Sequence, residues 1–69
     1  MEFLEAVLAV LEEEKEPMHW TVIQDRALKR GYLDPFTQGN IRRGLLAALA
    51  DGSKKGLVKK SSTGVYELA

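Results

Sequence analysis

Hydrophobic residues follow a helical period over the first part of the chain. Between residues 2 and 15 they recur at positions i, i+1, i+4, i+5 and i+8, which places them in one stripe on a helix. The stripe consists of Phe3, Leu4, Val7, Leu8 and Leu11. Pro17 ends this helix, because the residue before a proline is driven out of helical geometry.

A second helix follows a short extended segment, Pro17–Trp20. Either His19 or Thr21 can cap its first turn, and Thr21 is intrinsically the better capping residue. The helix runs to about Arg30 and stops at Gly31, because glycine readily adopts the left-handed conformation that ends helices. We expect its buried face to consist of Trp20, Ile23, Ala27 and Leu28.

A third helix begins between Asp34 and Asn40 and ends near Asp51 and Gly52. At about 100° per residue, its apolar side chains gather on one side: Ile41, Leu45, Ala48 and Leu49. The opposite side holds Asn40, Arg43, Ala47 and Ala50, with Arg42 and Leu46 on the flanks. We therefore expect one side of this helix to pack on the core and the other to face a partner.

Two β-prone runs close the chain, Leu57–Lys60 and Val65–Ala69, on either side of the small residues Ser61–Gly64. This pattern predicts a β-hairpin, reached from the third helix through a polar connector at Ser53–Gly56. A hairpin is marginal by itself and must dock on the helices. We expect its core residues to be Leu57, Val58, Tyr66 and Leu68. Met18–Trp20 is placed to add a short third strand.

Three helices followed by a hairpin predict an α+β fold, the winged helix-turn-helix with a C-terminal β-hairpin wing. Its 69 residues suit one domain, so we expect residues 1–69 to form a single winged-helix domain. No apolar run approaches the roughly 20 residues that span a bilayer, and Glu2 and Glu5 interrupt the place of a signal peptide. The chain has no cysteine. We therefore expect a cytoplasmic protein with no membrane partner.

Catalytic and metal-binding patterns are missing from the sequence. His19 is the only histidine, and without cysteine neither a nucleophile–base pair nor a paired metal-ligand spacing can be built from the usual residues. No phosphate-cradling or dinucleotide-binding glycine motif occurs. The sequence therefore predicts a protein that is not an enzyme and uses no cofactor and no metal.

The charge is zero in total but unevenly distributed. Residues 1–34 hold eight acids and four bases, a balance of −4, whereas residues 35–69 hold two acids and six bases, a balance of +4. Such asymmetry is typical of a protein with one face for a polyanion, although two solvated charged surfaces would give the same count. In helix-turn-helix proteins the second helix of the motif enters the major groove of DNA. The candidate DNA-binding residues are Gln38, Asn40, Arg42, Arg43, Lys54, Lys55, Lys59 and Lys60.

Several segments resemble the HARE-HTH domains, winged helices found in homeobox, Asx-like and restriction-endonuclease proteins and related to the N-terminal domain of the bacterial RNA polymerase delta subunit. The matching segments are Phe3–Val7, Pro17–Trp20, Ile23, Ala27, Gly31–Leu33 and Gly64–Leu68. The resemblance implies a link between DNA or chromatin recognition and attached catalytic or regulatory domains. Asp34–Gly39 stands where the family has a threonine-proline stretch, so the resemblance does not carry over a DNA sequence preference.

Two functions follow from this combination. The first is a regulatory module that binds double-stranded DNA, with the third helix in the major groove and the basic wing on the backbone. The alternative is a winged helix that binds a protein, for example the transcription machinery, because a fold alone does not fix a function. In that case the acidic first helix or a patch around Leu46 makes the contact.

Overall fold

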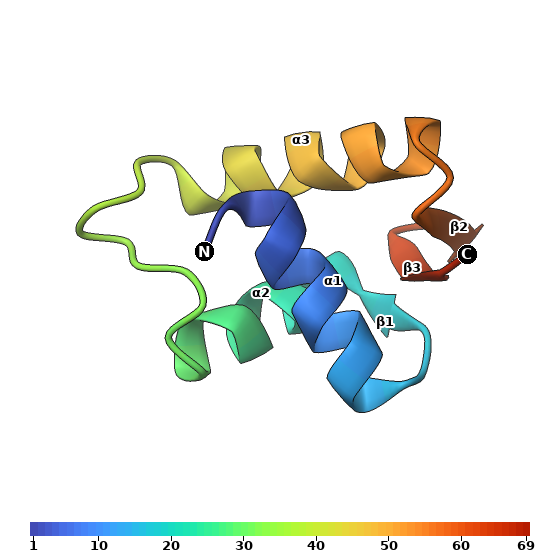
Figure 1. Ribbon diagram of the computed structural model, residues 1–69, viewed down its shortest axis with the longest axis horizontal. Coiled ribbons are helices and arrows are strands. Elements are labelled where there is room, and N and C mark those ends of the chain that lie inside the picture. Colours follow the sequence, from blue (N-terminus) through green and yellow to red (C-terminus); the bar gives the residue numbers. More distant parts are fainter.

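Three helices and a small three-stranded sheet make up the chain in a computed structural model that describes all of residues 1–69 (Figure 1). They are α1 (Phe3–Glu14), β1 (Met18–His19), α2 (Trp20–Lys29), α3 (Ile41–Lys54), β2 (Val58–Ser62) and β3 (Val65–Leu68). Helix α1 packs against both other helices, and the β2–β3 hairpin lies beside the C-terminal end of α3 (Figure 1). The predicted α+β winged helix-turn-helix is confirmed.

Helix α1 begins at a reciprocal cap and ends at a left-handed residue. The backbone N–H of Glu2 donates to the Glu5 carboxylate at 3.0 Å, while the Glu2 side chain accepts from the first turn. Lys15, at φ 54°, closes the helix before Pro17. The fully buried face consists of Ala6, Val7, Val10 and Leu11. Leu8 is only partly buried, contrary to the prediction, because packing against both α2 and α3 turns the core side away from it.

The start of α2 corrects the prediction that Thr21 caps this helix. His19 is the cap, because its Nδ1 accepts the Thr21 backbone N–H at 3.3 Å and lies 2.8 Å from the Thr21 hydroxyl. The sheet decides this: β1 holds His19 extended beside β3, and the Trp20 N–H donates to the Gly64 carbonyl at 2.9 Å. After α2 the chain turns at Gly31, as predicted, with φ 72°.

Helix α3 is longer than predicted. It begins at Ile41, with Asn40 as its cap, and continues through Lys54, so part of the expected polar connector is helical. The chain leaves the helix at Gly56, whose φ of 73° belongs to the left-handed region. The predicted buried side is confirmed for Leu45, Ala48 and Leu49, whereas Ile41 is partly buried.

Two glycines in α3 allow α1 to approach closely. A Cβ atom at Gly44 would lie 2.3 Å from the Phe3 ring, and one at Gly52 would lie 3.0 Å from Leu4 and 3.2 Å from Val58. Both are tighter than ordinary van der Waals contact, so the missing side chains create the space that these neighbours fill. Gly52 therefore lies inside the helix as a packing residue and does not end it.

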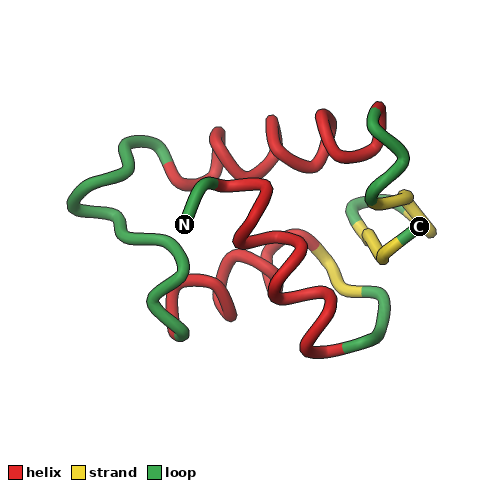
Figure 2. Tube along the Cα trace, in the orientation of Figure 1, coloured by secondary structure: helices red, strands yellow, loops and turns green.

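The sheet has the antiparallel order β1-β3-β2, which confirms the expected third strand for Met18 and His19. Strand β2 runs to Ser62 and carries an irregularity between Lys60 and Ser62, so the turn is shorter than predicted and centres on Thr63 and Gly64. The β2–β3 wing is the part of the sheet that follows α3, whereas β1 joins α1 to α2 (Figure 2).

The hydrophobic core corrects two sequence assignments. Leu57 is 41% exposed because the strand begins one residue later, and Val58 takes the buried place at 2% exposure. Leu33, predicted to be part of a surface turn, is 2% exposed. Its backbone N–H bonds back to the Ala27 carbonyl at 3.3 Å, and this turn folds the side chain under α2.

Candidate nucleic-acid interface

The exposed side of α3 carries a row of small and basic residues. Arg43, Ala47, Ala50 and Lys54 are all exposed and lie opposite the buried residues of the helix. Their spacing of three to four residues places them in one line along the helix. Alanines at the centre of the row allow a flat or grooved partner to approach the helix backbone closely.

Ion pairing separates the basic residues into two groups. In the first half of the chain every base is paired, through Lys15–Glu12 at 3.7 Å, Arg26–Glu14 at 3.6 Å, Lys29–Asp25 at 3.3 Å and Arg30–Glu14 at 2.7 Å. In the second half only Lys55 is paired, with Asp51 at 2.9 Å. The remaining bases form no ion pair; we call them the free bases, and they are Arg42, Arg43, Lys54, Lys59 and Lys60.

The paired bases belong to a network between the C-terminal ends of α1 and α2. Arg30 donates to Glu13 at 2.8 Å and to Glu14 at 2.7 Å, and the Tyr32 hydroxyl also donates to Glu13. The hydrogen bond from Arg30 lowers the pKa of Glu14, with the positive charges of Arg30 and Arg26 acting in the same direction. This part of the surface neutralises its own charge and has little attraction left for a polyanion.

Two of the predicted site residues use their side chains within the protein. Gln38 is partly buried, its amide nitrogen donates to the Met1 carbonyl at 2.7 Å, and its amide oxygen accepts from the Asp34 N–H at 2.8 Å. Asn40 caps α3, with its Oδ1 accepting the Arg43 N–H at 3.1 Å. The Asn40 side chain stays at the exposed N-terminal end of α3, whereas the Gln38 amide is fully engaged in the loop between α2 and α3.

The wing presents its lysines on an edge strand. Strand β2 pairs only with β3, and its single buried residue is Val58, followed by exposed residues through Ser62. Lys59 and Lys60 lie in this exposed stretch, opposite Glu67 and Tyr66 in the register. Lysines on an edge strand discourage pairing with another sheet and also offer two positive charges to an anionic partner.

One neighbour of the basic face was not anticipated from the sequence. The guanidinium carbon of Arg42 lies 5.4 Å from the centre of the Trp20 ring, within the range of a cation–π contact. Trp20 is partly buried at the start of α2 and contacts the core on its other side. No sequence signal reports this contact, because the two residues belong to different helices.

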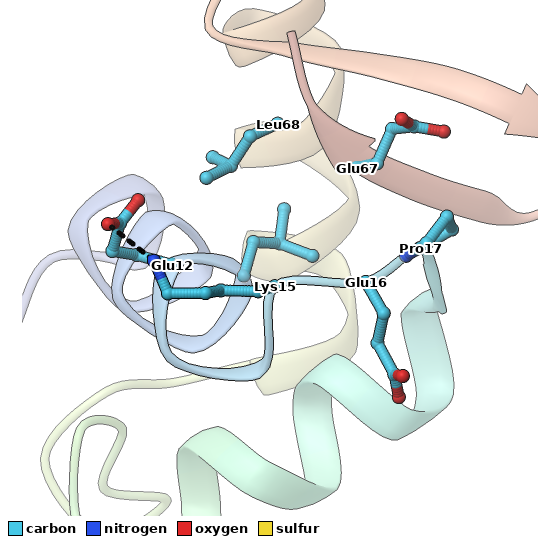
Figure 3. Close-up of a pocket in the computed structure, with 7 residues that line it drawn as sticks. Glu12, Lys15, Glu16, Pro17, Glu67 and Leu68 are labelled. Carbon is cyan, nitrogen blue, oxygen red and sulfur yellow. Dashed lines mark ion pairs between the residues drawn. The ribbon is translucent and has the colours of Figure 1, made fainter.

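A surface pocket of about 230 Å³ lies away from these bases, between the end of α1 and strand β3 (Figure 3). It is lined by Leu11, Glu12, Lys15, Glu16, Pro17, Glu67 and Leu68. Lys15 pairs with Glu12, and the carboxylates of Glu12, Glu16 and Glu67 point in different directions (Figure 3). No group of three or more potential metal-ligating residues forms anywhere in the chain. The pocket's acidic rim makes the face with the free bases the better candidate interface.

The fold and the exposed α3 together define a winged helix-turn-helix domain. Comparison with protein families matches residues 1–66 to HARE-HTH, the helix-turn-helix domain of homeobox, ASXL and restriction endonuclease proteins, and the chain belongs to this family. HARE-HTH domains are generally DNA-binding helix-turn-helix modules. No curated protein and no solved structure gives a match. None of the helices has both the length and the apolar character needed to cross a membrane.

Proposed function

We propose that this domain is a regulatory, non-enzymatic module that binds double-stranded DNA. In this proposal the exposed side of α3 enters the major groove and the wing lies on the sugar-phosphate backbone. The main support is the distribution of free charge: every free base belongs to α3 or β2, while the bases of α1 and α2 and of the segments that follow them are neutralised by neighbouring carboxylates. Free positive charge on the element that fits the groove favours a polyanion.

The free bases divide into two roles by position. Arg43, at the N-terminal end of the exposed α3 row, is placed to read base edges, with Asn40 beside it. Lys59 and Lys60 on the wing, with Lys54 at the far end of α3, are placed for phosphates. Lys55 already neutralises Asp51 and contributes less. So few ionic contacts give modest affinity that weakens strongly with salt.

The test is a fluorescence anisotropy titration of labelled duplexes at several salt concentrations. Replacing Lys59 and Lys60 together by alanine should weaken binding to all sequences alike and reduce the salt dependence by up to about two ionic contacts. The matched control replaces Lys15 and Lys29, which removes the same charge from the opposite, ion-paired region. Equal losses in the two double variants would show only a general charge effect and would contradict the assigned interface.

Protein binding is the second candidate function, and one observation favours it. Phe36 is 96% exposed in the loop between α2 and α3, although its own N–H is fixed by the Asp34 carboxylate at 2.9 Å. An exposed aromatic side chain on an ordered turn is the kind of anchor that protein interfaces use. Leu46, by contrast, is partly buried against the core. A wild-type protein that binds no duplex at low salt would rule out DNA binding and leave this function, with the transcription machinery as the partner to test.

A further inference from the structure

Arg42 and Arg43 are neighbours in α3 but face different surfaces, because successive residues of a helix point about 100° apart. Arg43 belongs to the exposed row on the outer side of the helix, whereas Arg42 lies over Trp20 at the start of α2. Arg42 forms no ion pair and donates no hydrogen bond to another side chain. Its N–H groups are therefore held in one place by the ring and remain available to a ligand.

Trp20 also connects Arg42 to the wing. The Trp20 N–H donates to the Gly64 carbonyl at 2.9 Å, and the His19 and Trp20 rings lie 5.7 Å apart. The His19 Nε2 lies so close to the wing turn that a Cβ atom on Gly64 would be 2.6 Å from it. Gly64, His19, Trp20 and Arg42 thus form a continuous line of contacts from the wing to α3, which we call the wing–α3 seam.

We propose that the wing–α3 seam binds a backbone phosphate of DNA, with Arg42 as the residue that contacts the phosphate and Trp20 as the positioning residue that holds Arg42. This inference rests on the proposed DNA binding and adds a division of labour to it. A planar guanidinium can donate to two phosphate oxygens at once. Arg42 then supplies a contact that is indifferent to sequence, while Arg43 on the outer side of α3 is left to meet the bases.

A double-mutant cycle on DNA affinity tests the assignment. Arg42→Ala should weaken binding to all duplexes alike and lower the slope of log affinity against log salt by about 0.9, the value for one phosphate contact. Trp20→Leu should weaken binding roughly two- to fivefold, which corresponds to loss of an exposed cation–π contact. In the Arg42→Ala background, Trp20→Leu should have no further effect, because the side chain that it positions is gone.

Arg43 provides the matched control. In the Arg43→Ala background, Trp20→Leu should still cause its full two- to fivefold loss. Trp20→Phe, which keeps an aromatic ring against the core, should cause a smaller loss and serves if Trp20→Leu fails to fold. Trp20 effects that are equal in the wild-type and Arg42→Ala backgrounds would show a merely structural role and overturn the inference alone. Absence of wild-type binding at low salt would overturn the DNA proposal together with the inference.

Discussion

The Gln38 amide shows how much a single side chain contributes to the loop between α2 and α3. It joins Asp34 to Met1, a residue 37 positions away in the sequence, while the Met1 amino group donates to the Tyr32 carbonyl at 3.0 Å. His19 and Asn40 complete backbone groups that a helix leaves without partners at its ends. A position at a helix end is visible in the sequence and suggests such capping, whereas a long-range bond like that of Gln38 is not.

Burial decides what a leucine contributes to stability, and Leu45 and Leu8 allow a direct comparison. Leu45 is fully buried, so Leu45→Ala should lower the free energy of unfolding by about 2–5 kcal/mol through lost contacts and an unfilled cavity. Leu8→Ala should cost clearly less, because Leu8 is partly exposed already. Chemical denaturation of both variants measures the difference, and equal losses would contradict the observed orientation of α1.

At the scale of elements, the crossing of α1 and α3 depends on residues without side chains. Phe3 fills the space above Gly44, and Leu4 and Val58 fill the space around Gly52. Glycine inside a helix is normally unfavourable by roughly 0.5–1 kcal/mol relative to alanine, so its presence here indicates that close approach of the two helices outweighs helix propensity.

The effect of Gly44→Ala should therefore depend on Phe3. In the wild-type background the new methyl group would lie 2.3 Å from the Phe3 ring, and displacing the ring should destabilise the fold by about 1–2 kcal/mol. In a Phe3→Ala background the same substitution should stabilise it by up to about 1 kcal/mol, because only the helix propensity remains. Thermal unfolding of the four proteins tests this, and the same sign in both backgrounds would show that Gly44 does not serve the crossing.

At the scale of the whole molecule, charge is neutralised on one side and left free on the other. Glu13, Glu14, Arg26 and Arg30 pair with one another between α1 and α2, and Tyr32 joins them. The hydrogen bond to Glu13 raises the pKa of Tyr32, with desolvation acting in the same direction. The network ties α1 to α2 and ties the stability of the fold to pH.

Stability should consequently fall in alkaline solution. A folded-state pKa of Tyr32 above its unfolded value of about 10 means that its contribution is complete below pH 10 and is lost as the pH rises through the folded pKa. Tyr32→Phe should remove this loss, whereas Tyr66→Phe, on the wing, should keep it. The measurement is the denaturation midpoint between pH 8 and roughly 11.5, spanning that reference value; parallel curves for wild type and Tyr32→Phe would contradict the assignment.

The sequence by itself determined the element order, the side of α3 that is buried, the wing and the family, because periodicity and turn residues act between near neighbours in the chain. The candidate interface was equally visible, since Arg43, Lys59 and Lys60 fall on exposed sides by the same periodicities.

Only the tertiary structure decided the residues whose environment comes from other elements. Pairing of β1 with β3 made His19 the cap of α2, and docking of the hairpin buried Val58 in place of Leu57. The position of α2 beside α3 placed Trp20 under Arg42. Ion pairs between helices decided which bases remain free. Such contacts join residues that are distant in the chain, so they exist only once the elements pack together, and no local pattern encodes them.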